Sequence, residues 1–209
     1  MGSVAPTSKA FLPGTLGWTA RDLDDPDFEG LWFQGRYEIV EGVLTQMPAA
    51  YFAGGSALSN LLFLLKLHTR THGPAGSFAV ETDIVLGETR VVVADAVFMT
   101  PNDAQRQAAA VAREGRPDPD RSRVYVPPTL IIESVSPDHG LHDRQTKRNW
   151  YAAFGVPNFW LLDAFGASLQ CLTLHGTGYR EDVTASNQDE VRPSLFPGLV
   201  ISLAEVWEE

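Results

Sequence analysis

The sequence has little cysteine, and its hydrophobic runs are short. A single cysteine, Cys171, can form neither an internal disulfide nor a cysteine metal cage, which is typical of a reducing cytoplasm. The longest apolar helical run, 61–67, is interrupted by Lys66 and falls well short of the roughly 20 residues that cross a membrane. The N-terminus also lacks a charged and then apolar leader. We therefore expect a cytoplasmic protein that does not cross a membrane.

Basic residues are scarce as well. Sixteen Lys and Arg residues stand against 26 Asp and Glu residues, which gives a formal net charge of −10. Non-specific nucleic-acid binders usually have a basic surface, because the release of phosphate counterions supplies much of their affinity. An acidic chain can still act on nucleic acid where its positive charge is local or a metal ion bridges protein and phosphate. A function on phosphates must therefore rest on a particular site.

What the sequence does have is enough apolar material for one core. Its 209 residues are 44% hydrophobic and 10% aromatic, a length and composition typical of a single globular domain. Residues 1–35 are rich in Gly, Pro and Asp without a sustained period, which predicts an N-terminal arm. Residues 36–209 are expected to form a single domain.

The order of secondary-structure elements predicts an α/β fold. Residues 36–47 predict a hairpin that turns at Glu41-Gly42, and Ser56 is placed to cap a helix that ends near Arg70. A helix over about 142–154 is expected to connect the strand at 129–135 to the strand at 158–163. The expected strands span 77–86, 90–99, 129–135, 158–163 and 168–174, with an alanine-rich helical piece inside 102–123 and a short strand and helical turn after 196. This order predicts a mixed β-sheet flanked by helices.

Two carboxylates interrupt otherwise apolar strands. Asp95 stands within Val-Val-Val-Ala-Asp-Ala-Val-Phe, and Glu133 stands within Leu-Ile-Ile-Glu-Ser-Val. Burial of an unpaired carboxylate is costly unless a metal or another cation neutralises it. The alternative is a carboxylate at a strand end that reaches solvent or a neighbouring backbone N–H.

A lysine on the apolar face of the second helix bears on that choice. At about 100° per residue, Lys147 falls among aromatic residues such as Trp150 on the side that packs on the sheet. This helix begins about ten residues after Glu133, so we expect Lys147, Glu133 and Asp95 to converge at one edge of the sheet. The alternative is a lysine whose stem packs on Trp150 while its ammonium reaches water.

Two carboxylates and a lysine suit a divalent cation. Oxygen ligands without a cysteine or histidine cluster favour Mg²⁺ or Mn²⁺ over zinc, and the reaction class is metal-assisted phosphodiester hydrolysis. His68 and His72 have i, i+4 spacing, but no glutamate lies between them as in a zinc protease and no third ligand is evident.

The chain has one concentrated basic patch near the expected site. Its members are His139, His142, Arg144 and Arg148. The patch either contacts phosphates or is a solvated loop, and the sequence leaves both interpretations open.

Several stretches of the chain resemble a known family. Residues 127–137 read Pro-Pro-Thr-Leu-Ile-Ile-Glu-Ser-Val-Ser-Pro, and Asp143, Lys147, Tyr151 and Gly-Val-Pro-Asn-Phe-Trp-Leu-Leu-Asp (155–163) follow. Together they resemble the Uma-type "putative restriction endonuclease" family of the PD-(D/E)XK nuclease superfamily. The resemblance extends over 36–199 and is most specific between 127 and 163. It implies a restriction-endonuclease-like core with αβββαβ order, a Mg²⁺ site, DNA as substrate and a homodimer.

The resemblance assigns roles to the candidate residues. Asp95 matches the motif aspartate, although Ala94 stands where proline is usual, and Glu133 matches the second acid. Val135 occupies the position of the superfamily's lysine. Members of this family carry that lysine on the following helix, which here is Lys147.

Further roles follow from the same resemblance. The backbone carbonyl of Ser134 is the expected third protein ligand of the metal. Glu41 is either an outer-shell carboxylate or simply part of a hairpin turn. Asp143 is expected to cap the helix and orient Lys147 rather than bind metal, and the role of Asp163 stays open.

The function expected from these residues is a Mg²⁺-dependent DNA endonuclease. The alternative is a catalytically weak or inactive nuclease-fold protein that binds or regulates, which the net charge of −10 and the absent strand lysine both favour. Hydrolysis of RNA or of a small phosphodiester is a third possibility.

Overall fold

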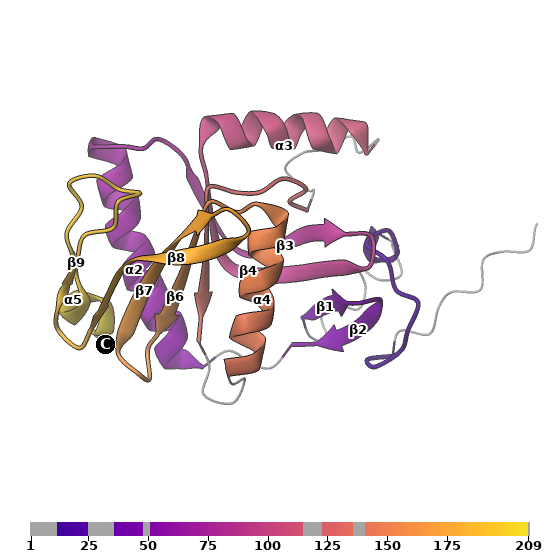
Figure 1. The fold of residues 1–209 in the computed structure, drawn as a ribbon, viewed down its shortest axis with the longest axis horizontal. Helices are drawn as coiled ribbons and strands as arrows, with labels where there is room; N and C mark the ends of the chain where they lie inside the picture. The colour runs from indigo at the N-terminus through magenta and orange to yellow at the C-terminus, as the bar shows by residue number, and fades with distance from the viewer. Residues whose placement is uncertain (1–11, 25–35, 48–50, 115–122, 136–140, 209) are drawn as a thin grey trace, which may run out of the picture. The chain divides into compact units, whose positions relative to one another are not determined.

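The structure is a computed structural model that describes residues 12–24, 36–47, 51–114, 123–135 and 141–208 (Figure 1). The chain divides into two compact units. The first consists of Met1–Pro48 with Gly87–Val92, and the second of Ala49–Leu86 with Val93–Glu209.

The first unit contains the predicted hairpin. Strands β1 (Tyr37–Val40) and β2 (Val43–Gln46) pair antiparallel, and the turn residues Glu41 and Gly42 have φ of 51° and 77°. Positive φ at both central positions is the geometry of a two-residue hairpin turn. A short 3₁₀ helix, η1 (Asp22–Asp24), lies in the preceding segment.

The described part of the predicted arm hydrogen-bonds to this hairpin. The Gly14 N–H donates to the Leu44 carbonyl at 2.8 Å, and the Trp18 N–H donates to the Gly42 carbonyl at 2.9 Å. The remainder of the predicted arm, 1–11 and 25–35, lies outside the described residues. Treatment of 36–209 as one domain stays a prediction.

The second unit is built on a mixed sheet. Its strand order is β4-β5-β6-β7-β8, and β3 pairs with β4. Among the named strands of the described residues, only β5 and β6 pair in parallel, with α4 (Leu141–Phe154) as the crossover between them. The strands are β3 (Ser77–Gly87), β4 (Arg90–Met99), β5 (Leu130–Ser134), β6 (Asn158–Asp163), β7 (Ser168–His175) and β8 (Gly178–Ser186). The residues of β3 and β4 that fall within Gly87–Val92 belong to the first unit. The predicted α/β fold, a mixed β-sheet flanked by helices, is therefore confirmed, and the sheet is largely antiparallel.

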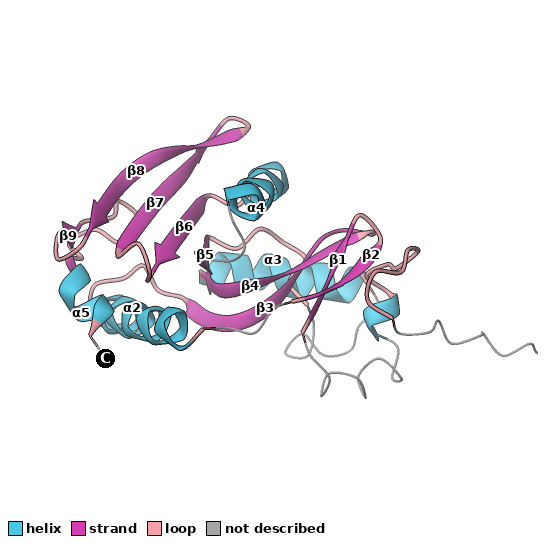
Figure 2. Cartoon of the chain, turned by 90° about the horizontal axis from the view of Figure 1, so that it is seen from below, coloured by secondary structure: helices cyan, strands magenta, loops and turns pink. Residues whose placement is uncertain are grey.

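Helices cover both faces of this sheet (Figure 2). Helix α2 (Phe52–Thr71) buries Leu61 and Leu65 in a core shared with Ile132 and Trp160. Helix α4 lies on the other face, where the ring of Tyr151 packs on Phe159 with centroids 5.5 Å apart. The remaining elements are α3 (Pro101–Arg113), β9 (Glu190–Val191), β10 (Ile201–Ser202) and α5 (Leu203–Trp207). Because side chains alternate along a strand, the neighbours Ile132 and Glu133 belong to opposite faces.

The structure differs from the sequence-based expectation at the start of α2. The helix begins at Phe52 with Tyr51 as its N-cap, one turn before Ser56. Gly54 is buried, and a Cβ at this position would lie 3.9 Å from the Ser134 hydroxyl. The first turn is therefore helical and in contact with the end of β5 despite the low helix propensity of Gly54-Gly55.

Strand β8 was not predicted. Its sequence, Gly-Tyr-Arg-Glu-Asp-Val-Thr-Ala-Ser, contains three consecutive charged residues, and of its side chains only Tyr179 is buried. An edge strand with a solvated face has no need of apolar alternation, and its charges discourage pairing with other chains.

The N-terminus of α3 is fixed by Asp103. Thr100 and Asp103 form a capping box, and the Asp103 carboxylate also accepts hydrogen bonds from Arg106 and from the Thr129 hydroxyl, just before β5. Burial tends to raise the pKa of Asp103, but hydrogen bonds from Thr129, Arg106 and Thr100 outweigh it and hold this pKa below its usual range.

We expect Asp103→Ala to lower the free energy of unfolding by about 2 kcal/mol at pH 7, because it removes both the cap and the link to β5. A lowered native pKa means that this stabilisation is present above the ordinary aspartate pKa of about 4 and is lost as the pH falls through the lower native value. Urea denaturation of both proteins at several pH values measures the difference. A difference that stays constant from pH 7 to below pH 3 would contradict an ionised Asp103.

Candidate active site

A buried ion pair of the second unit joins β5 to α4. Glu133 is 9% exposed and Lys147 is 7% exposed, and the Lys147 Nζ lies 3.5 Å from the Glu133 Oε2. The same ammonium donates to the Val93 carbonyl at 3.1 Å. The structure thus brings together two of the residues singled out in the sequence, and Lys147 does not extend into solvent.

A third side chain contacts the same carboxylate. The hydroxyl of Tyr151 donates to the Glu133 Oε1 at 2.6 Å, and Tyr151 is fully buried. Lys147 and Tyr151 are i, i+4 neighbours on α4, so their side chains lie on one face of the helix. Sequence reasoning named Tyr151 among the residues of the family resemblance and gave it no role. The signal that could have found it is its spacing of one turn from Lys147.

Asp95 projects from the same face of the sheet as Glu133. The register of β4 and β5 pairs Ala96 with Ile132, and one more step of the same register would place Asp95 opposite Glu133. Opposite residues of antiparallel strands share a face, and Ala96 and Ile132 belong to the core under α2. The two carboxylates therefore belong to the α4 face.

Asp95 also completes the hydrogen bonding of β5. Its Oδ2 accepts the backbone N–H of Ser134 at 2.6 Å, at the point where the β4–β5 ladder has ended. This is the contact with a neighbouring backbone N–H that the sequence left open, and it holds the Asp95 carboxylate beside the strand that carries Glu133.

Ser134 contributes to both faces of this region. Its N–H donates to Asp95, while its hydroxyl lies 3.5 Å from the Gly54 carbonyl at the start of α2. The role of its backbone carbonyl as a metal ligand stays a prediction.

A model of a known protein family matches the sequence over most of its length. The Uma2 family model, described as "Putative restriction endonuclease", matches residues 30–204. This chain is a member of the Uma2 family. The match spans most of the chain and includes Asp95, Glu133 and Lys147.

A solved structure supports the fold of this Uma2 protein. The crystal structure of a putative nuclease belonging to DUF820 from Anabaena variabilis is 14% identical in sequence and has a TM-score of 0.63. The similarity covers 83% of this chain and 90% of that chain. The comparison with curated proteins found no match.

Two accessory candidates of the Uma2 protein have different surroundings. Glu41 lies in the first unit, on the hairpin turn, and pairs with Arg90 of the same unit. Asp143 belongs to the first turn of α4, where the side chains are outside the described part of the chain, as are those of His142 and Arg144. Their proposed roles stay predictions.

Of the predicted basic patch, the structure describes only the side chain of Arg148. His139 lies outside the described residues altogether. The Arg148 guanidinium donates to the Tyr179 carbonyl at 3.0 Å, which ties α4 to β8. Whether the patch contacts phosphates stays open.

The remaining polar candidates have structural roles. The rings of His68 and His72 stack with centroids 5.1 Å apart, and the buried His68 packs edge-on against Phe196. Asp163 Oδ1 accepts the N–H groups of Phe165 at 3.1 Å and Gly166 at 2.8 Å, which closes the turn between β6 and β7.

The donor set fits a hard divalent cation. Asp95 and Glu133 supply carboxylate oxygens from one face, and Mg²⁺ commonly takes one or two carboxylates and completes its shell with water. Among the residues that the structure describes, no group of three or more His, Cys, Asp or Glu side chains gathers as a metal site. A cation here would therefore depend on these two carboxylates and on backbone or water oxygens.

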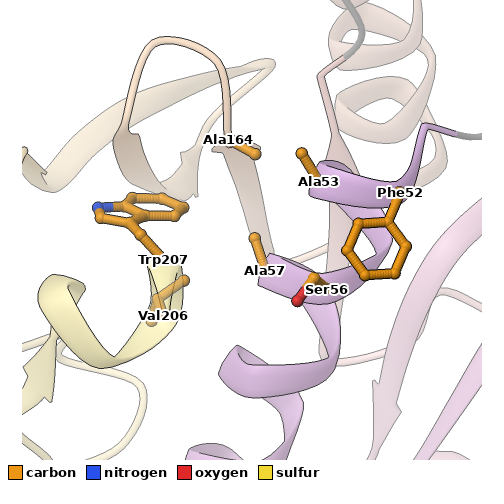
Figure 3. Close-up of a pocket in the computed structure, with 7 residues that line it drawn as sticks. All are labelled: Phe52, Ala53, Ser56, Ala57, Ala164, Val206 and Trp207. Carbon is orange, nitrogen blue, oxygen red and sulfur yellow. The ribbon is translucent and has the colours of Figure 1, made fainter. Parts of the chain in front are cut away.

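The pocket drawn in Figure 3 lies away from this site. It has a volume of about 150 Å³ and contains neither carboxylate nor lysine. Its lining comes from α2, the β6–β7 turn and α5: Phe52, Ala53, Ser56, Ala57, Ala164, Val206 and Trp207. Its lining offers no charged group for the chemistry of phosphate esters.

In the described part of the chain, no helix is long and apolar enough to cross a membrane.

Proposed function

We propose that this protein is a Mg²⁺- or Mn²⁺-dependent DNA endonuclease that hydrolyses phosphodiester bonds. The observation that carries the proposal is the buried Lys147–Glu133 pair on the sheet face from which Asp95 also projects. Membership of the Uma2 family supports the same reaction class.

Each residue has a distinct part in the proposed site. Asp95 and Glu133, with the Ser134 carbonyl, would hold the cation, which supplies positive charge to a phosphate oxygen. The Lys147 ammonium is fixed by the Val93 carbonyl and Glu133, so it provides a preorganised positive charge for the negative charge that develops in the transition state. Its burial strengthens that interaction, because water screens it less.

The substrate and assembly are part of this proposal. DNA is the substrate that the family description suggests, and a homodimer would present two sites to the two strands of a duplex. Light scattering of the purified protein tests the dimer, and a panel of DNA, RNA and small phosphodiesters tests the substrate.

We expect Asp95→Asn to reduce plasmid cleavage at least about 100-fold, because it removes a charged metal ligand. The amide oxygen of the introduced asparagine can still accept the Ser134 N–H, so the fold is retained. Asp163→Asn is the matched control, since Asp163, like Asp95, is an aspartate of the sheet that accepts backbone N–H groups. Cleavage is measured with Mg²⁺, Mn²⁺ and EDTA.

Two outcomes would contradict the proposal. One is cleavage by the wild type that persists in EDTA, and the other is equal cleavage by the Asp95→Asn and Asp163→Asn variants.

A binding or regulatory role without catalysis is the competing proposal. It is favoured by the small number of carboxylates in the described site and by Val135 at the usual lysine position. Calorimetry discriminates the two, because a chain that binds no Mn²⁺ between micromolar and millimolar concentrations has lost the metal-dependent chemistry.

A further inference from the structure

We propose that Tyr151 is a positioning residue of this site, whose phenol fixes the Glu133 carboxylate in the orientation that receives the divalent cation. The inference rests on the proposed function, since it concerns how one metal ligand is held. It assigns a role to a residue that neither the strand motif nor the family description identifies.

The first observation is how the carboxylate is held. Tyr151 donates to the Oε1 of Glu133 at 2.6 Å, and Lys147 lies 3.5 Å from its Oε2. Two side chains one turn apart on α4 therefore contact both oxygens of the Glu133 carboxylate. A glutamate side chain has three rotatable bonds, and two contacts of this kind leave its carboxylate little freedom.

The second observation is the length and burial of the Tyr151 hydrogen bond. A separation of 2.6 Å lies in the range of O–H···O⁻ bonds to an ionised acceptor. Both groups are buried, so the bond is neither screened nor replaced by water. Outer hydrogen bonds that orient a metal ligand typically account for about 10–100-fold in metal affinity.

The packing of the Tyr151 ring does not explain why this residue has a hydroxyl group. The Tyr151 ring lies against Phe159, and a phenylalanine would make the same contact. A buried hydroxyl is costly unless it finds a partner, and here its partner is Glu133.

The chain offers a close control in Tyr179. This tyrosine is also buried, packs on the same Phe159 with centroids 5.5 Å apart, and donates its hydroxyl to the Val156 carbonyl at 2.8 Å. Tyr179→Phe therefore removes a buried tyrosine hydrogen bond of the same kind without touching a carboxylate.

The experiment compares Mn²⁺ binding to the wild type, Tyr151→Phe and Tyr179→Phe by calorimetry. We expect Tyr151→Phe to bind Mn²⁺ about tenfold more weakly, and Tyr179→Phe to bind it as the wild type does. The Mn²⁺ concentration for half-maximal DNA cleavage should rise by the same factor in Tyr151→Phe, while kcat at saturating Mn²⁺ stays near that of the wild type. Thermal unfolding of the two variants should be similar, which separates positioning from general stability.

The outcomes distinguish the two proposals. Equal Mn²⁺ affinity of Tyr151→Phe and Tyr179→Phe overturns the role of Tyr151 while the nuclease proposal stands. A wild type that binds no Mn²⁺ overturns both.

A measurement on the wild type tests the same inference if the Tyr151→Phe variant does not fold. Protein labelled with 3-fluorotyrosine should show a ¹⁹F NMR signal of Tyr151 that moves on saturation with Mg²⁺, while the signal of Tyr179 does not. A Tyr151 signal that stays in place at saturation overturns the inference.

Discussion

Lys147→Met is expected to reduce DNA cleavage about a thousandfold and to lower the free energy of unfolding by about 3–5 kcal/mol. Activity is lost because the fixed ammonium is removed. Stability is lost because the Glu133 carboxylate stays buried without the Lys147 ammonium that pairs with it. Methionine keeps most of the aliphatic stem, so the variant tests the charge rather than the packing.

The control for this prediction is Lys66→Met. Lys66 is an exposed lysine on α2, and its replacement should change neither cleavage nor stability appreciably. Plasmid cleavage and urea denaturation in the absence of metal measure both effects.

The double variant Glu133→Gln/Lys147→Met separates stability from chemistry. Replacement of both charges removes the unpaired carboxylate, so part of the lost stability should return, whereas cleavage should not. Full cleavage by Lys147→Met, or a double variant as unstable as the sum of its single variants, would contradict the buried pair as the centre of the site.

The buried charges were the most predictable part of the site. Asp95 and Glu133 interrupt apolar strands, and Lys147 falls on the apolar face of its helix, where a charge requires a partner because its burial is costly. That rule identifies the residues without knowledge of the contacts. The contacts themselves depend on the register of β4 and β5, which the local sequence does not define.

Tyr151 shows why the rest of the site could not be predicted. A tyrosine on the core face of a helix has the same pattern as a packing residue, and only the coordinates reveal that its hydroxyl meets Glu133. The Asp95–Ser134 hydrogen bond is hidden in the same way, since it forms where a ladder between strands distant in sequence ends.

The fold was predictable where its elements have apolar faces. Strands β4, β5 and β6 follow the expected order because their side chains are largely buried, and β7 and helix α4 follow it because each has one buried face. Two features of the fold were not predicted, for opposite reasons. The first turn of α2 contains glycines that packing accommodates, whereas β8 has a polar sequence that only its pairing with β7 holds as a strand.

Gly76→Ala is expected to lower the free energy of unfolding by about 3 kcal/mol, because the position before β3 has no room for a methyl group. A Cβ there would overlap the ring of Phe98 and lie 2.5 Å from the Met99 carbonyl oxygen. The Phe98 ring is fully buried, with Phe78 and Phe196 at centroid distances of 4.6 and 5.5 Å, so it has no open space to move into.

Gly55→Ala provides the opposite case. Gly55 lies inside α2 with nothing within 4 Å of an added Cβ, so alanine should stabilise the protein by about 0.5–1 kcal/mol through its higher helix propensity. Urea denaturation of the two variants should therefore give shifts of opposite sign, and equal shifts would contradict the tight approach at Gly76. Phe98 stands three residues after Asp95 on β4 and pairs with Leu130, in the strand that carries Glu133. Any movement of β4 that makes room for the added methyl group in Gly76→Ala should thus also weaken Mn²⁺ binding, whereas Gly55→Ala should leave it unchanged.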